Sequence, residues 1–102
     1  MLRLSIIIPA FNEEKTILEL LHRVNKVSIK GVEKEVIVID DCSNDNTLKL
    51  LEENGQLFTK LIKFKSNSGK GAAVKRGLKE ATGQYILFQD ADLEYDPNDY
   101  KK

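Results

Sequence analysis

Residues 85–92 read Tyr-Ile-Leu-Phe-Gln-Asp-Ala-Asp, an apolar run that ends in two acidic residues spaced one residue apart. An unbroken run of β-branched and aromatic residues predicts a strand that is buried on both faces. If the chain stays extended past Phe88, Asp90 and Asp92 point the same way, because side chains alternate along a strand. Two neighbouring carboxylates repel each other and favour a divalent cation. Taken alone, the pattern also fits a polar turn with Asp as a capping residue.

The composition describes one small soluble domain. A length of 102 residues, 41% hydrophobic and 31% charged, is sufficient for one core. Sixteen basic and sixteen acidic residues balance, so no overall field recruits nucleic acid. The longest apolar runs are too short to cross a bilayer and the N-terminus lacks a signal-peptide layout, so we expect a cytoplasmic location. A single cysteine, Cys42, excludes an internal disulfide.

Three further strands are predicted upstream of the opening stretch. They cover Leu4–Ile8, which Pro9 ends, Glu35–Ile39 and Phe58–Phe64. Lysines alternate with apolar residues in the last of these, which predicts a position at the edge of the sheet.

Three helices are predicted between these strands. The first begins at Asn12 as its N-cap and continues to about Ser28. The second covers roughly Asp45–Asn54 and stops at Gly55. The third follows the Ser66–Gly71 turn, and its apolar stripe is expected to consist of Val74, Leu78 and Ala81.

Alternating strands and helices specify an α/β fold, a three-layer open and mostly parallel sheet with helices on both faces. The expected strand order is 3-2-1-4. Ligands of such sheets bind beyond the carboxyl ends of the strands, at the point where the strand order reverses. The Pro9–Glu14 loop would then face Asp90 and Asp92 across a crevice, with Asp41 at the same edge.

Four carboxylates are expected at this crevice, those of Glu13, Asp41, Asp90 and Asp92. They would repel one another unless a cation or several hydrogen-bond donors were shared among them. A nucleotide bound with a metal supplies both. Asp41 could accept a hydrogen bond from a base, Phe11 could offer it an apolar face, and the Asp90 and Asp92 pair could hold Mg²⁺ or Mn²⁺ against a diphosphate. The alternative for the acidic pair after the second strand is a capped turn.

Three other side chains have chemistry of their own. Lys70 lies between two glycines at a helix start, where free N–H groups favour phosphate, but the segment lacks the spacing of a Walker P-loop. The side chain of Lys70 could therefore either contact a phosphate or be a solvated lysine at the start of a helix. His22 is expected to be a partly exposed helix residue. Cys42 follows two acidic residues and is not expected to be a reactive thiolate.

Four segments in this order, residues 8–14, 39–47, 67–73 and 90–93, resemble motifs of the family 2 glycosyltransferases. The chain is most similar to the dolichyl- or polyprenyl-phosphate mannosyl- and glucosyltransferases, from Leu4 to about Tyr100. The resemblance implies a GT-A fold of which this is the Rossmann-like half, UDP- or GDP-sugar donors, and Mg²⁺ or Mn²⁺ as cofactor.

The resemblance also implies roles for individual residues. The metal ligands would be Asp90 and Asp92. Together with the crevice argument, it gives these nucleotide-sugar-binding candidates: Pro9, Ala10, Phe11, Glu13, Asp41, Lys70, Asp90 and Ala91. Catalytic residues stay unknown, because the family's acceptor-binding half lies beyond Lys102.

We therefore expect residues 1–102 to form a single nucleotide-sugar-binding domain, the N-terminal part of a longer glycosyltransferase. The complete enzyme would transfer a hexose to an acceptor, a polyprenyl phosphate, by metal-assisted inverting displacement at the inner face of the membrane. The chain alone would bind donor at most, and could self-associate through an exposed sheet edge.

Two other functions share part of this pattern. A receiver-like signalling module shares the α/β units, but it carries its acidic pair after the first strand, where this chain has Pro9 and Ala10. A nucleotidyltransferase shares the fold and the metal, but requires a glycine-rich basic loop after the first strand, and none is present.

Overall fold

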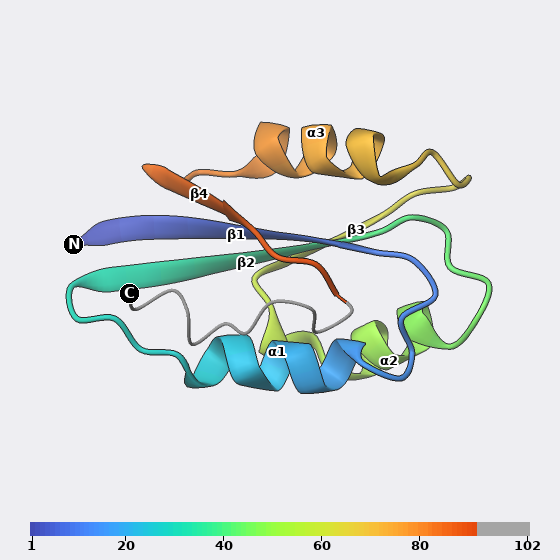
Figure 1. Cartoon of the computed structure of the whole chain (residues 1–102), viewed down its shortest axis with the longest axis horizontal. Coiled ribbons are helices and arrows are strands. Elements are labelled where there is room, and N and C mark those ends of the chain that lie inside the picture. Colours follow the sequence, from blue (N-terminus) through green and yellow to red (C-terminus); the bar gives the residue numbers. More distant parts are fainter. Residues whose placement is uncertain (92–102) are drawn as a thin grey trace.

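The computed structural model describes residues 1–91, which form a parallel sheet between two layers of helices (Figure 1). Asp92, expected as a metal ligand, lies outside the described residues. The elements along the chain are β1 (Leu2–Ala10), α1 (Ile17–Lys26), β2 (Val32–Asp40), α2 (Thr47–Glu53), the 3-10 turn η1 (Gly55–Leu57), β3 (Lys60–Lys63), α3 (Lys70–Glu80) and β4 (Tyr85–Phe88).

Within the described residues the strand order is β3-β2-β1-β4, which confirms the predicted topology. All three pairings are parallel, with Ala10 of β1 opposite Asp40 of β2 and Ile7 of β1 opposite Phe88 of β4. β3 lies at one edge, as its lysines predicted. β2 and β3 follow on one side of β1, whereas β4 lies on its other side. The topological switch point is therefore between β1 and β4.

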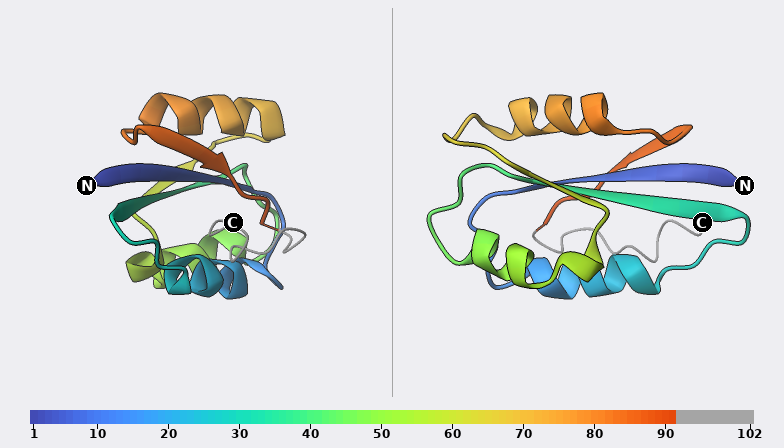
Figure 2. Two further views of the ribbon diagram at one scale, coloured as in Figure 1. Left: turned by 60° about the vertical axis from the view of Figure 1, so that its left-hand side comes forward. Right: turned by 180° about the vertical axis from the view of Figure 1, so that it is seen from behind.

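The two helix layers bury different faces of β1 and β2. α1 and α2 cover one face and α3 covers the other, as the views from the side and from behind also show (Figure 2). Alternate residues of the strands therefore enter separate clusters, with Ile6 and Ile8 packing beneath α1 and Ile7 beneath α3. All three are fully buried. Burial on both faces explains why these strands have no polar alternation.

The predicted start of the first helix was wrong. The first helix begins at Ile17 rather than at Asn12, because Asn12 has a φ of 53° and lies in a loop. The second helix covers Thr47–Glu53 with Asn54 as its C-cap, so Gly55 follows directly after the end of the helix, as predicted. The predicted stripe of α1 is confirmed, since Ile17, Leu20, Leu21, Val24 and the following Val27 are buried.

The predicted stripe of α3 was wrong in part, although its Ala81 does pack against the buried cluster beneath the helix. Ala73 and Gly77 face the sheet, whereas Leu78 is 44% exposed. A Cβ on Gly77 would lie 2.5 Å from Cγ2 of Ile7, so the helix approaches the sheet too closely for a larger side chain. The backbone of α3 lies so close to the sheet that only a very small residue fits at this position. The spacing of apolar residues along a helix does not show such a close approach.

β4 is not buried on both faces as its composition predicted. Tyr85, Ile86 and Phe88 are exposed, Phe88 by 52%. Among the described residues β4 pairs only with β1, so it forms an edge, and α3 packs over β1 and β2 instead. Self-association through this edge stays a prediction.

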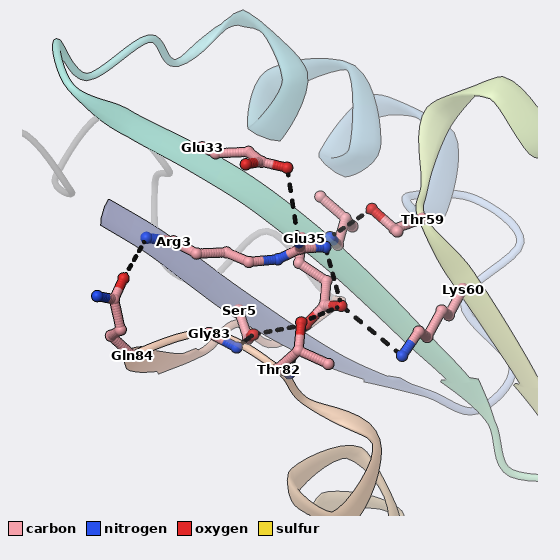
Figure 3. A network of polar contacts seen from close by, with 10 residues as sticks. Arg3, Ser5, Glu33, Glu35, Thr59, Lys60, Thr82, Gly83 and Gln84 are labelled. Carbon is pink, nitrogen blue, oxygen red and sulfur yellow. Dashed lines mark hydrogen bonds and ion pairs between the residues drawn. The ribbon is translucent and has the colours of Figure 1, made fainter. Parts of the chain in front are cut away.

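The amino-terminal rim of the sheet carries a buried polar network (Figure 3). Its centre is Glu35 of β2, 1% exposed. The carboxylate accepts hydrogen bonds from the Ser5 hydroxyl, from the backbone N–H and hydroxyl of Thr82, and from the Arg3 guanidinium. The ammonium of Lys60 lies 3.7 Å away. The network joins β1, β2, β3 and the segment that leads into β4, at the rim opposite the predicted crevice.

Candidate functional site at the carboxyl ends of the strands

A pocket of about 460 Å³ opens where β1, β2 and β4 end. Its lining includes all eight predicted nucleotide-sugar-binding residues: Pro9, Ala10, Phe11, Glu13, Asp41, Lys70, Asp90 and Ala91. Asn67, Gly69 and Ala73 complete it. Segments more than 75 residues apart in sequence therefore meet at one place, as the parallel topology requires.

The loops that follow β1 and β2 are joined by hydrogen bonds that begin at Asn12. The Asn12 backbone N–H donates to the Ser43 hydroxyl at 3.0 Å, and the Asn44 N–H donates to Oδ1 of Asn12 at 2.7 Å. Asn tolerates the left-handed conformation that this arrangement demands. Asn12 thus connects two loops instead of capping a helix.

A second set of contacts extends this connection away from the pocket. The Glu13 N–H donates to the Thr47 hydroxyl at 2.8 Å, and the Asn46 N–H donates to Glu14 at 3.3 Å. Asp45 accepts from both the N–H and the hydroxyl of Thr47. Burial raises the pKa of Asp45, but these hydrogen bonds outweigh it and lower the pKa below its ordinary value. The carboxylate therefore stays ionised while it holds the loop.

Asp41 fixes the opposite wall of the pocket. Its side chain is buried, with Oδ1 accepting from the Ser68 N–H at 2.7 Å and Oδ2 accepting from the Gly69 N–H at 2.9 Å. Gly69 has a φ of 92°, which permits the turn that presents both N–H groups. Each carboxylate oxygen has a second lone pair, so Asp41 can hold this loop and still accept from a ligand.

The segment after β4 is anchored from the start of α1. The Thr16 hydroxyl donates to the carbonyl of Ala91 at 2.7 Å, and the Gln89 N–H donates to the carbonyl of Ile7 at 3.0 Å. These contacts hold Asp90 at the pocket, where its carboxylate accepts from the ammonium of Lys70. Thr16 occupies the N-cap position of α1 but makes no capping hydrogen bond.

The charges of the lining decide what the pocket can hold. Glu13, Asp41 and Asp90 contribute carboxylates and Lys70 contributes an ammonium group. The formal net charge is therefore negative, and a diphosphate would be repelled without a cation to accompany it. Among residues 1–91, no three His, Cys, Asp or Glu side chains are placed to hold a metal ion by themselves. Mg²⁺ and Mn²⁺ bound through one or two carboxylates together with substrate phosphates fit this donor set.

Several residues that shape the site were not among the predicted site residues. Asn67, Gly69 and Ala73 line the pocket, and Asn12 and Thr16 position its loops. The glycine pair around Lys70 was a usable signal for Gly69, whereas nothing local distinguishes Thr16 from an ordinary helix cap. His22 is exposed as expected, and the thiol of Cys42 lies 3.6 Å from the carbonyl of Lys65.

These features define an α/β domain with a ligand pocket at its topological switch point. Residues 5–102 match the family model described as glycosyl transferase family 2. The chain belongs to this family.

Relatives with assigned names support that membership. The chain is 40% identical over 94 residues to the poly(ribitol-phosphate) beta-N-acetylglucosaminyltransferase TarS of Staphylococcus aureus, covering 90% of this chain and 16% of that protein. It is 35% identical over 97 residues to the dolichol-phosphate mannosyltransferase of Pyrococcus furiosus, covering 94% and 27%. The chain spans between 16% and 43% of the length of the curated relatives that it matches.

Solved structures agree with the fold. S. aureus TarS 1–349 in complex with UDP superimposes with a TM-score of 0.79 at 38% identity, covering 88% of this chain and 27% of that chain. The mannosyltransferase PcManGT from Pyrobaculum calidifontis, in complex with GDP-Man and Mn²⁺, gives 0.73 at 28% identity, covering 89% and 28%. In the part of the chain that the structure describes, no helix has the length and apolar character needed to span a membrane.

Proposed function

We propose that this chain is the donor-binding domain of a longer glycosyltransferase that takes a hexose from a UDP- or GDP-sugar. The observation that carries the proposal is the convergence of eight predicted residues on one pocket. Relatives crystallised with UDP or with GDP-Man and Mn²⁺ support a nucleotide-sugar ligand. Family membership argues against the receiver-like module and the nucleotidyltransferase.

Different residues of the pocket would bind different parts of the donor. Phe11, 39% exposed, offers an apolar surface to the base, and Asp41 accepts a hydrogen bond from it. Asp90, together with Asp92, would hold Mg²⁺ or Mn²⁺, as Mn²⁺ in neighbouring complexes supports. The metal supplies positive charge that stabilises the departing diphosphate.

The acceptor we propose is a polyprenyl phosphate. Several relatives carry names that specify dolichyl, undecaprenyl or dodecaprenyl phosphate. A lipid phosphate oxygen is ionised near neutral pH and would attack the anomeric carbon without a general base, as the bond from that carbon to the diphosphate oxygen breaks and the nucleoside diphosphate leaves, with inversion. A hydroxyl acceptor would require a carboxylate base from outside this domain. Such an acceptor would place the complete enzyme at the inner face of a membrane.

Calorimetric titration with UDP, GDP and their sugars, with and without Mn²⁺, tests the proposal. We expect one nucleotide to bind in a metal-dependent manner. Asp90→Asn should weaken that binding at least tenfold, because a neutral amide is a poor ligand for a hard cation. Glu53→Gln removes an equivalent carboxylate from the exposed side of α2 and should leave binding unchanged. Equal binding by the two variants, or no binding of any nucleotide, would overturn the proposal.

A further inference from the structure

Lys70 and Asp90 form an ion pair inside the candidate site. The ammonium of Lys70, the first residue of α3, donates to Oδ1 of Asp90, which follows β4. Asp90 is 27% exposed and Lys70 is 66% exposed, so the carboxylate is held in the pocket while the lysine remains largely in solvent. The ion pair thereby joins two residues of the pocket lining that are 20 apart in sequence.

The position of Lys70 is not explained by helix stability. A cation in the first turn of a helix opposes the helix dipole, which favours negative charge at that end. Lysine here is also flanked by Gly69 and Gly71, which contribute no side chain to hold it. The ion pair with Asp90 gives this lysine a role that helix stability does not.

Lys70 occupies the place of a second cation. Asp90 is the proposed ligand of a divalent metal, and an ammonium group on the same carboxylate competes with that metal and repels it. A diphosphate would attract both cations, because lysine is a flexible point charge that binds phosphate readily. The two cations can share the site only when the donor's phosphates are also present.

We propose that Lys70 is an internal counter-cation that keeps Asp90 neutralised until the nucleotide binds, so that the metal enters with the donor and not before it. The donor's phosphates then attract Lys70 and release Asp90 for the metal. This inference rests on the proposed function. It adds that occupancy of the metal site is coupled to the nucleotide through one lysine.

The test is Mn²⁺ binding by the full chain, followed by the electron paramagnetic resonance signal of free Mn²⁺. Without nucleotide, Lys70→Met should bind Mn²⁺ roughly fivefold more tightly than the parent chain, the range that a partly exposed ion pair supports. With Mn²⁺ saturating, the same variant should bind UDP or GDP roughly fivefold more weakly, because it lacks a phosphate-binding ammonium. The two effects have opposite signs, which a general loss of folding cannot produce.

Two further variants serve as controls. Lys75→Met removes the same charge from an exposed position on the same helix and should change neither affinity. Lys70→Arg keeps the charge and should keep Mn²⁺ binding weak in the absence of nucleotide. Thermal unfolding of each variant checks that the fold is intact.

The outcomes separate this inference from the proposed function. If the parent chain binds Mn²⁺ with a nucleotide but Lys70→Met does not bind Mn²⁺ more tightly alone, the inference is wrong and the proposed function stands. If Lys70→Met and Lys75→Met raise Mn²⁺ affinity equally, the effect is one of net charge and the inference is again wrong. If the parent chain binds neither nucleotide in any condition, both are overturned.

Discussion

The Ser5 hydroxyl donates a hydrogen bond to the carboxylate of Glu35 over 2.6 Å, and so links β1 to β2 at the rim that lies opposite the pocket. The same hydroxyl accepts from the Gly83 N–H at 2.8 Å. Glu35 is therefore a buried anion whose partners come from β1, from β3 and from the segment that leads into β4. Its removal should affect stability without touching the ligand site.

Glu35→Gln should destabilise the fold by about 2–4 kcal/mol, since it leaves buried donors and cations without their charged partner. Urea unfolding measures the change. Glu33→Gln on the same strand breaks only an exposed ion pair with Arg3, 3.5 Å long, and should cost less than about 0.5 kcal/mol. Similar losses in the two variants would show that the Glu35 network contributes little.

The stability of the chain should depend on pH through Glu35. Burial raises the pKa of this carboxyl, but hydrogen bonds from Ser5 and Thr82 and the charge of Lys60 lower it to about 2, from 4.5. Because the pKa of Glu35 is lower in the folded chain, the unfolded chain takes up the proton at a higher pH than the folded chain does. The stabilisation is therefore complete above pH 4.5 and is lost as the pH falls toward 2, by about 3 kcal/mol.

Unfolding measured between pH 6 and pH 2 checks this dependence. In Glu35→Gln the decline should be shallower. A residual decline is expected from Asp45, whose pKa is lowered in the same direction. Identical pH profiles for the parent chain and the variant would contradict the assignment to Glu35.

Gly77→Ala should destabilise the fold by about 1–2 kcal/mol. Its Cβ would lie 2.5 Å from Cγ2 of Ile7 and 3.1 Å from Cδ1 of Ile39, and the overlap outweighs the gain in helix propensity. Gly71→Ala on the same helix meets nothing within 4 Å and should be neutral or stabilising by up to about 1 kcal/mol. Denaturant midpoints compare the two, and a stabilising Gly77→Ala would show that α3 can move away from the sheet.

Thr16→Val should weaken metal-dependent nucleotide binding about fivefold, because the hydroxyl no longer holds the Ala91 carbonyl beside Asp90. Thr16→Ser keeps the hydroxyl and should bind like the parent chain. Calorimetry gives the affinities, and unfolding should show a loss of no more than about 1 kcal/mol. Equal affinities for the valine and serine variants would mean that this contact does not position Asp90.

The strands and their order could be predicted from the sequence, because strands that are buried on both faces consist of unbroken apolar runs. Unbroken apolar runs at Ile6–Ile8 and Val36–Ile39 have one stable environment, the centre of a parallel sheet. Parallel strands then bring their carboxyl ends together, which is why residues as distant as Phe11 and Asp90 could be assigned to one pocket.

The failures concern contacts between segments that are remote in sequence. Asn is a common helix N-cap residue, but the side-chain oxygen of Asn12 accepts a hydrogen bond from the N–H of Asn44, 32 residues away, and does not cap a helix. Leu78 follows the apolar period of α3, but the buried positions of the helix are Ala73 and Gly77, and at Gly77 the helix lies too close to Ile7 for a larger side chain. Periodicity describes which residues prefer burial, and it carries no information on how closely two elements approach.

The buried network around Glu35 has a consequence for how such chains can diversify. Because this network ties the strands together at one end of the sheet, a substitution of a pocket-facing side chain at the other end leaves its contacts intact. Ligand preference can therefore drift by substitution around the pocket while the framework persists, which is a physical route by which one scaffold could come to serve many sugars.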